Sequence, residues 1–163
     1  MNNCEICVVR DDELALCVDV VRAAFATVAQ SFGLTEENCP TNAAFMKIDR
    51  LLYDKNKGNL MFVLKTGGAI AGFMQLENKG EGRFELKNIA VAPAYRHDGF
   101  GKMLLDFAKS TVRQRGGSKI SLGIIEENTV LRHWYEENGF AHLGTKIFEH
   151  LPFTVGFMET VID

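Results

Sequence analysis

The chain has 163 residues, which is enough for one domain, and a chain of this length buries roughly 70% of its unfolded surface without disulfides or metals. A content of 47% hydrophobic and 24% charged residues is typical of a soluble globular protein, and the formal net charge of −3 argues against a nucleic-acid-binding protein. No apolar run reaches the roughly 20 residues that a membrane span needs, and the N-terminus has no signal-peptide pattern. We therefore expect a single domain over residues 1–163, with no nucleic-acid and no membrane partner.

The four cysteines, Cys4, Cys7, Cys17 and Cys39, do not predict a metal site. Cys4 and Cys7 form a C-x-x-C pair, but the sequence has no second pair and no flanking His. On a strand, their odd separation would place the two thiols on opposite faces. Free or buried thiols indicate a reducing compartment, so we expect a cytoplasmic protein without a bound metal.

The first half of the chain predicts a strand, two helices and three further strands. Residues 6–10 are typical of a short strand, and Asp11 and Asp12 offer a helix N-cap. Apolar residues at steps of three and four then predict a helix to about Gln30. A second helix is expected from Phe45 to near Gly58. Three strands are then predicted, over 59–66, 69–77 and 84–91, and they form an antiparallel meander. Gly67-Gly68 joins the first two strands, and a loop over 78–82 joins the last two.

The second half alternates helices and strands. The expected elements are a helix from Phe100 that ends at Gly116-Gly117, a strand over 119–124, a helix over 128–138, and strands over 141–150 and 153–161. The resulting order is β-α-α-β-β-β-α-β-α-β-β. This order predicts a mixed α/β fold with a mostly antiparallel central sheet of about seven strands, flanked by about four helices.

The link between the strand over 84–91 and the helix that follows it has the composition of an anion site. It reads Arg96-His97-Asp98-Gly99-Phe100-Gly101. The first N–H groups of a helix lack partners and favour an anion, and glycines let a phosphate approach the backbone. Neither the dinucleotide fingerprint nor the P-loop fits, since G-x-G-x-x-G is incomplete and Met103 stands where a P-loop carries Ser or Thr.

Two motifs at linked spacing carry a family resemblance. The first is R-x-x-G-x-G from Arg96 to Gly101, directly after the strand that ends in Ile89-Ala90-Val91. The second is Asn128 followed seven residues later by Tyr135 and then by Gly139-Phe140. With these motifs the chain resembles the GNAT superfamily of acyl-CoA-dependent N-acyltransferases. The resemblance implies a GNAT-like fold, acetyl-CoA as co-substrate and transfer of an acetyl group, by direct attack in a ternary complex, to a primary amine of a small molecule or peptide. It leaves a homodimer open.

The resemblance also implies where acetyl-CoA binds. Backbone groups of Ile89 and Val91 would pair with the pantetheine arm in a cleft between the strands 84–91 and 119–124, and the Ile89 N–H would polarise the thioester carbonyl. The residues expected around the pyrophosphate are Arg96, His97, Gly99, Phe100, Gly101 and Lys102. Two roles stay open for Asn128, which would hold CoA or cap its helix.

Two further residues are the catalytic candidates under this resemblance. Tyr135 would protonate the departing CoA thiolate as a general acid, and the alternative is a buried aromatic with a structural hydroxyl. Glu85 would assist deprotonation of the amine, with His150 or a water chain as alternatives. The competing interpretations of the whole chain are a non-catalytic acyl-CoA-binding regulatory module and a pure interaction domain.

Overall fold

The computed structural model describes residues 3–163 and contains seven strands and four α-helices in this range. The strands are β1 Cys4–Val8, β2 Leu60–Thr66, β3 Ala69–Gly80, β4 Arg83–Val91, β5 Lys119–Ile125, β6 Ala141–Ile147 and β7 Thr154–Val161. The helices are α1 Leu14–Ser31, α2 Ile48–Asn56, α3 Phe100–Gln114 and α4 Thr129–Glu137. Short 3-10 turns precede α1 and α2 and follow β4.

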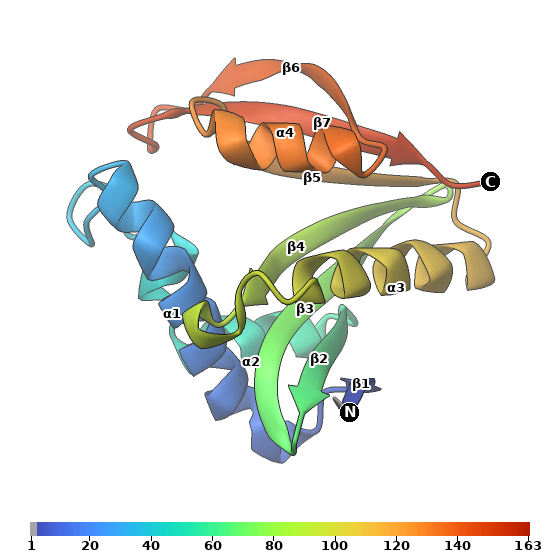
Figure 1. Cartoon of the computed structure of the whole chain (residues 1–163). Helices are drawn as coiled ribbons and strands as arrows, with labels where there is room; N and C mark the ends of the chain where they lie inside the picture. The colour runs from blue at the N-terminus through green and yellow to red at the C-terminus, as the bar shows by residue number, and fades with distance from the viewer. Residues whose placement is uncertain (1–2) are drawn as a thin grey trace.

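All seven strands form one sheet in the order β1-β2-β3-β4-β5-β7-β6. Every neighbouring pair is antiparallel except β4 and β5, which run parallel and pair only from Arg83–Glu85 to Lys119–Ser121. Beyond these residues the two strands separate, and the sheet opens into two wings (Figure 1). One wing holds β1 to β4, and the other holds β5, β7 and β6.

Two cores cover the two faces of the larger wing. Helices α1 and α2 pack on one face, with Val21 and Leu51 against Val63 and Phe73. The amphipathic α3 packs on the other face, and its core continues to β5, β7 and α4 through residues such as Met158. Figure 1 shows α3 beneath the opening between the wings, with α4 packed along the smaller wing.

The fold class and the order of elements are confirmed, with four corrections at the level of single elements. Helix α2 begins at Ile48 instead of Phe45, which lies in the 3-10 turn before it, and β6 ends at Ile147 instead of 150, because Leu151 donates its N–H to the Phe148 carbonyl in a turn. The first strand covers Cys4–Val8 instead of 6–10, because Arg10 already turns the chain by donating its N–H to Glu13 at 2.9 Å. The loop predicted over 78–82 is mostly strand: β3 continues to Gly80, which pairs with Arg83. Glu81 and Gly82 alone make the turn, both with positive φ, the geometry of a tight two-residue hairpin.

The N-terminal helical segment, Asp11–Ser31, has a mean hydropathy of 1.4 and is the one segment among residues 3–163 whose length and composition would also suit a membrane span. Its apolar face is part of the protein's own core, because Leu14, Cys17 and Val21 are buried. The two thiols of the C-x-x-C pair contact different cores, Cys4 that of α3 and Cys7 that of α1, as their spacing predicts. No group of metal-ligating side chains is found among the described residues.

The start of α1 depends on a buried carboxylate. Glu13 is 4% exposed, and Lys65 of β2 lies 2.6 Å from it. The hydrogen bonds from Lys65 and from the Arg10 backbone lower the pKa of Glu13. A carboxyl group with a lowered folded-state pKa stabilises the fold above its unfolded pKa, and this contribution is lost as the pH falls through the folded pKa.

We predict that Glu13→Gln lowers the free energy of unfolding at pH 7 by about 1–3 kcal/mol, because Lys65 loses its charged acceptor. The difference from the wild type should shrink as the pH falls below about 4, because the unfolded-state carboxylate is protonated there and the folded-state carboxylate follows at its lower pKa. Urea denaturation at the two pH values measures this effect. Glu149→Gln, on an exposed turn, is the matched control, and an equal loss of stability in both variants would contradict the assignment.

Candidate active site

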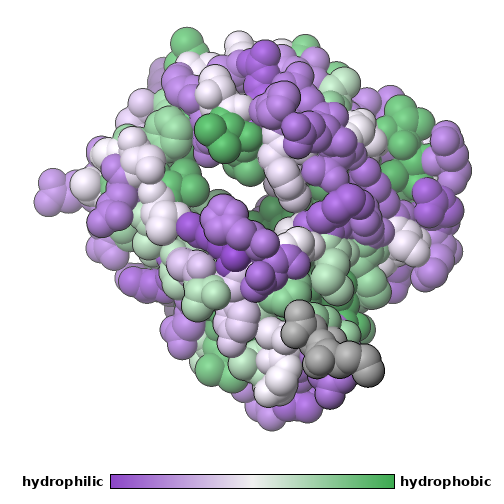
Figure 2. Space-filling model, in the orientation of Figure 1, coloured by the Kyte–Doolittle hydropathy of each residue, from purple (hydrophilic) through white to green (hydrophobic). Residues whose placement is uncertain are grey.

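A cavity of about 670 Å³ lies where β4 and β5 separate. Its walls come from the second half of α1, from β4, from the loop before α3 and the first turn of α3, from the end of β5, and from α4. Figure 2 shows an opening in the middle of one face of the molecule that continues through it, with a hydrophobic rim on one side and a hydrophilic rim on the other. The cavity is therefore accessible along the line where the wings part.

The glycine loop forms one end of this cavity. Gly99 precedes α3 with a left-handed φ of 79°, and no atom lies within 4 Å of the position that a Cβ would occupy there. The backbone N–H groups of Phe100, Gly101 and Lys102 begin the helix and make no hydrogen bond to the described residues. Free N–H groups and the positive end of the helix dipole make a site that fits a pyrophosphate.

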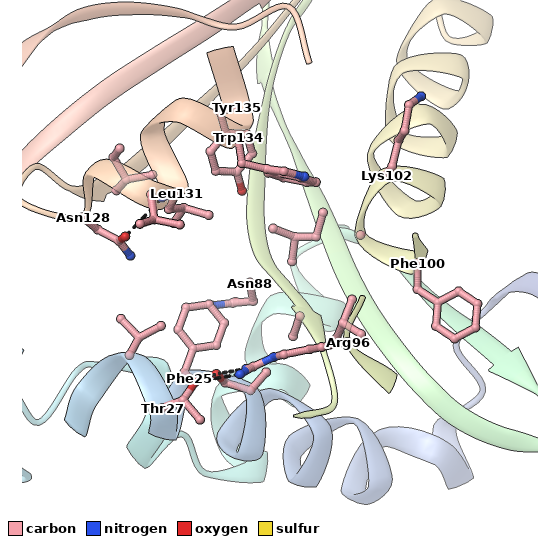
Figure 3. Close-up of a pocket in the computed structure, with 18 of the residues that line it drawn as sticks. Phe25, Thr27, Asn88, Arg96, Phe100, Lys102, Asn128, Leu131, Trp134 and Tyr135 are labelled. Carbon is pink, nitrogen blue, oxygen red and sulfur yellow. Dashed lines mark hydrogen bonds between the residues drawn. The ribbon is translucent and has the colours of Figure 1, made fainter. Parts of the chain in front are cut away.

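Arg96 is committed to holding this loop in place. Its guanidinium donates to the carbonyl of Ala24 at 2.7 Å and to the Thr27 hydroxyl at 3.0 Å, both on α1 (Figure 3). The expected contact of Arg96 with a phosphate stays a prediction: Arg96 lines the cavity, and its guanidinium has N–H groups beyond the two that bond α1. The neighbouring His97 lines the cavity and is exposed, whereas Asp98 is exposed and does not line it.

A β-bulge marks the point where β4 turns away from β5. Asn88 has a φ of 55°, and Asn88 and Ile89 together stand opposite the single residue Met74 of β3. The bulge places both of these consecutive residues, with Val91 further along, on the wall of the cavity. Of the predicted pantetheine contacts, Ile89 thus lies in the bulge itself and Val91 lies between the bulge and the glycine loop.

Asn128 caps α4, as one of its two open roles predicts. Its side-chain oxygen accepts a hydrogen bond from the N–H of Leu131 at 3.2 Å. In Figure 3 its amide nitrogen points into the cavity. Capping and ligand binding are therefore compatible, because they use different atoms of the same amide group.

Tyr135 reaches the cavity from the opposite wall to Ile89. Its ring is buried and packs edge-on against Trp134 and Phe140, with centroid distances of 5.0 and 5.3 Å. Its hydroxyl makes no hydrogen bond to another described residue. Among residues 3–163, every fully buried side-chain oxygen has a hydrogen-bond partner, so the hydroxyl is not fully buried and is open to the cavity. Burial raises the pKa of Tyr135 well above its usual value, which keeps the phenol protonated at neutral pH.

The two candidate bases lie outside the cavity. Glu85 is half-buried in the part of β4 that still pairs with β5, and Lys79 lies 3.8 Å from its carboxylate. His150 is exposed in the turn between β6 and β7, where it packs against Phe148. No Asp or Glu is among the described residues that line the cavity.

Sequence reasoning expected the first two helices to help form the acceptor pocket, but it did not identify the α1 residues that line the cavity, nor the bulge. Phe25, Thr27 and Val28 line the cavity, but an ordinary amphipathic helix pattern contains no sign of this. Asn88 did carry a signal: Asn is depleted in strands and tolerates a left-handed conformation, so an Asn within the apolar strand over 84–91 favours a bulge.

The cavity thus combines an anion cradle, an opened sheet edge and a protonated tyrosine, the arrangement expected of an enzyme that transfers an acyl group from a phosphate-bearing carrier. The profile of the acetyltransferase (GNAT) family matches residues 29–140. This match covers more than half of the chain, and the protein belongs to this family of acetyltransferases.

Individual relatives agree with this assignment. An uncharacterised N-acetyltransferase of Lactobacillus delbrueckii subsp. lactis is 26% identical over 135 residues, which are 75% of this chain and 77% of the relative. The ribosomal-protein-S18-alanine N-acetyltransferase of Escherichia coli has a similar structure, with a TM-score of 0.79 and 19% identity over 98% of this chain and 94% of that one. The PaiA N-acetyltransferase of Thermoplasma acidophilum, in complex with coenzyme A, gives a TM-score of 0.78 at 19% identity over 98% and 99%. At these identities the two solved structures support the fold alone.

We predict that Gly101→Val abolishes measurable acetyl-CoA binding or weakens it at least tenfold. A Cβ at this position would lie 3.4 Å from the Trp134 ring, so a valine occupies space beside the first N–H groups of α3. Titration calorimetry measures the affinity, and a melting curve verifies that the variant is folded. Gly144→Val is the matched control, since a Cβ there meets no atom within 4 Å and Gly144 does not line the cavity. Wild-type affinity in folded Gly101→Val would contradict the cradle.

Proposed function

We propose that the protein is an N-acetyltransferase that moves an acetyl group from acetyl-CoA to a primary amine of a small molecule or peptide, by direct attack in a ternary complex. The observation that carries this proposal is the placement of the Tyr135 hydroxyl and the free N–H groups of α3 on one cavity. The fold of the CoA-bound relative supports acetyl-CoA as the co-substrate.

In this proposal the cavity has a CoA end and an acceptor end. The first turn of α3 binds the pyrophosphate, and the backbone of Val91 and Ile89 pairs with the pantetheine arm as an added strand would. Acetyl-CoA supplies an activated acetyl thioester. The Ile89 N–H donates to the thioester carbonyl oxygen, which gains negative charge during the attack. The acceptor then enters from the side of α1 and α4, past Phe25 and Leu131.

Two protons must move for the reaction to balance. The amine nitrogen forms a bond to the carbonyl carbon and loses a proton, while the carbon–sulfur bond breaks. Tyr135 donates its proton to the departing sulfur; burial raises its pKa, so the phenol carries this proton at neutral pH until the sulfur gains negative charge. Glu85 lies on the same face of β4 as Lys87, which stands opposite Gln75 in the sheet, on the side of α1. From this face, Glu85 takes up the proton of the amine through intervening water.

We predict that Tyr135→Phe lowers kcat by about 10²- to 10⁴-fold, the usual effect of losing a general acid. The acetyl-CoA affinity should change much less, because the proton moves only in the transition state. The melting temperature should stay close to that of the wild type, because the hydroxyl has no hydrogen-bond partner among residues 3–163 to lose. Release of free thiol with a panel of amines measures kcat. A near-normal kcat in this variant would show that Tyr135 is structural.

We predict that Glu85→Gln lowers kcat at neutral pH with little change in acetyl-CoA affinity, and that raising the pH partly restores the rate. Deprotonation of the amine in bulk water at high pH replaces the lost base. The matched control is Glu81→Gln, in the exposed turn beside the same strand. An unchanged kcat for Glu85→Gln at neutral pH would leave deprotonation to water or to His150.

A non-catalytic acyl-CoA-binding module is the alternative outcome of these experiments. It predicts wild-type binding of acetyl-CoA with no thiol release for any amine in the panel. An interaction domain predicts no binding of acetyl-CoA at all. The two alternatives are therefore separated by calorimetry before any acceptor is known.

A further inference from the structure

A chain of buried polar side chains leads from α2 to the bulge in β4. Gln75, at the centre of β3, is fully buried, and its amide nitrogen donates to Asp54 at 3.0 Å and to the side-chain oxygen of Asn88 at 2.9 Å. Its amide oxygen accepts a hydrogen bond from Asn59 at 2.8 Å. Asp54 and Asn59 are themselves buried, so this row of hydrogen-bonded side chains lies inside the protein until it reaches Asn88.

This chain fixes which end of the Asn88 amide faces the cavity. The carboxylate of Asp54 only accepts hydrogen bonds, so the Gln75 NH₂ group must point toward it. The second N–H of this NH₂ group then requires an acceptor from Asn88, which is the side-chain oxygen. The Asn88 NH₂ group is therefore the end that remains for a ligand.

The Asn88 NH₂ group is free and accessible. This group makes no hydrogen bond to another described residue. Since every fully buried side-chain nitrogen in residues 3–163 has a hydrogen-bond partner, the NH₂ group is not fully buried and is open to the cavity that Asn88 lines. Figure 3 places Asn88 beside Phe25 of α1, whereas Phe100 and Lys102 at the start of α3 lie on the other side of the cavity. This is the end at which the proposed acceptor enters.

We propose that the Asn88 NH₂ group binds a carbonyl or carboxylate oxygen on the carbon that carries the acceptor's amine. Consecutive Cα atoms are about 3.8 Å apart, so an amine at a thioester beside Ile89 leaves its adjacent carbonyl oxygen within reach of Asn88. The acceptors are then α-amino acids, their amides or peptide N-termini. Polyamines and aminoglycosides are disfavoured, because no carboxylate is present among the lining residues to bind a second cation. This inference rests on the proposed function.

Matched acceptors test this specificity with the wild type. Leucine, leucine amide and 3-methylbutylamine share a primary amine and the same side chain, and only the first two carry the oxygen. Because this oxygen also lowers the pKa of the amine, the rates are compared per concentration of neutral amine. We expect kcat/KM for leucine or leucine amide to exceed that for 3-methylbutylamine at least tenfold, the value of one good hydrogen bond. The amide arm separates a peptide-like carbonyl from the free carboxylate. Equal rates on all three acceptors would overturn the inference.

Two variants assign the discrimination to Asn88. Asn88→Gly and Asn88→Asp both tolerate the positive φ, and neither keeps the NH₂ donors. We expect both to raise KM for leucine or leucine amide about tenfold or more and to leave the acetyl-CoA affinity within about twofold. Asn88→Gly, which adds no charge to the cavity, should also leave the rate with 3-methylbutylamine nearly unchanged. Asn78→Gly, on the exposed part of β3, is the matched control.

The outcomes distinguish this inference from the proposed function. If acetyl-CoA binds and acceptors are turned over, but folded Asn88→Gly discriminates as the wild type does, the inference is wrong and the function stands. If the wild type binds acetyl-CoA and releases no thiol with any amine, the proposed function fails and the inference fails with it.

Discussion

The separation of two parallel strands is the constraint on which the rest of the structure depends. Strands β4 and β5 pair over three residues each and then part, although both continue for several residues. Each keeps its partner on the outer edge, β3 for one and β7 for the other. The inner edges therefore present backbone N–H and C=O groups toward each other without pairing. Unpaired backbone groups in a partly enclosed space are costly unless water or a ligand binds them, so this opening is itself a binding site.

The opening is held by elements that are distant in sequence. Arg96 joins the glycine loop to α1 across 72 residues by its bond to Ala24, and this contact fixes the first turn of α3 relative to the α1 wall. A single core connects α3 with β5, β7 and α4, so the smaller wing is positioned by the same helix that supplies the anion cradle. Substrate affinity and the geometry of the wings are therefore coupled through α3.

The sequence predicted the parts of this site that follow from local chemistry. A glycine loop at a helix start, a capping Asn and a Tyr two turns later are local patterns, and Gly99, Asn128 and Tyr135 all lie on the cavity as expected. The tight hairpin at Glu81 was missed because a five-residue polar stretch resembles a loop, while pairing of Gly80 with Arg83 depends on the partner strand. The α1 wall and the buried Gln75 depend on tertiary contacts between distant segments, which no local pattern contains.

The charges around the cavity favour the neutral form of an amine. The groups that face it are donors: backbone N–H groups of α3, the amide nitrogens of Asn88 and Asn128, and the Tyr135 hydroxyl. Arg96 and Lys102 add two cations at its edge, bonded to α1 and to Asp106. They suit a pyrophosphate, a carbonyl oxygen that gains charge and a departing sulfur. An ammonium group that enters the same space loses hydration and finds no carboxylate among the described lining residues, and both effects lower its pKa. The environment that stabilises the negative charge of the reaction thus also promotes the loss of the proton that an amine must release before it attacks.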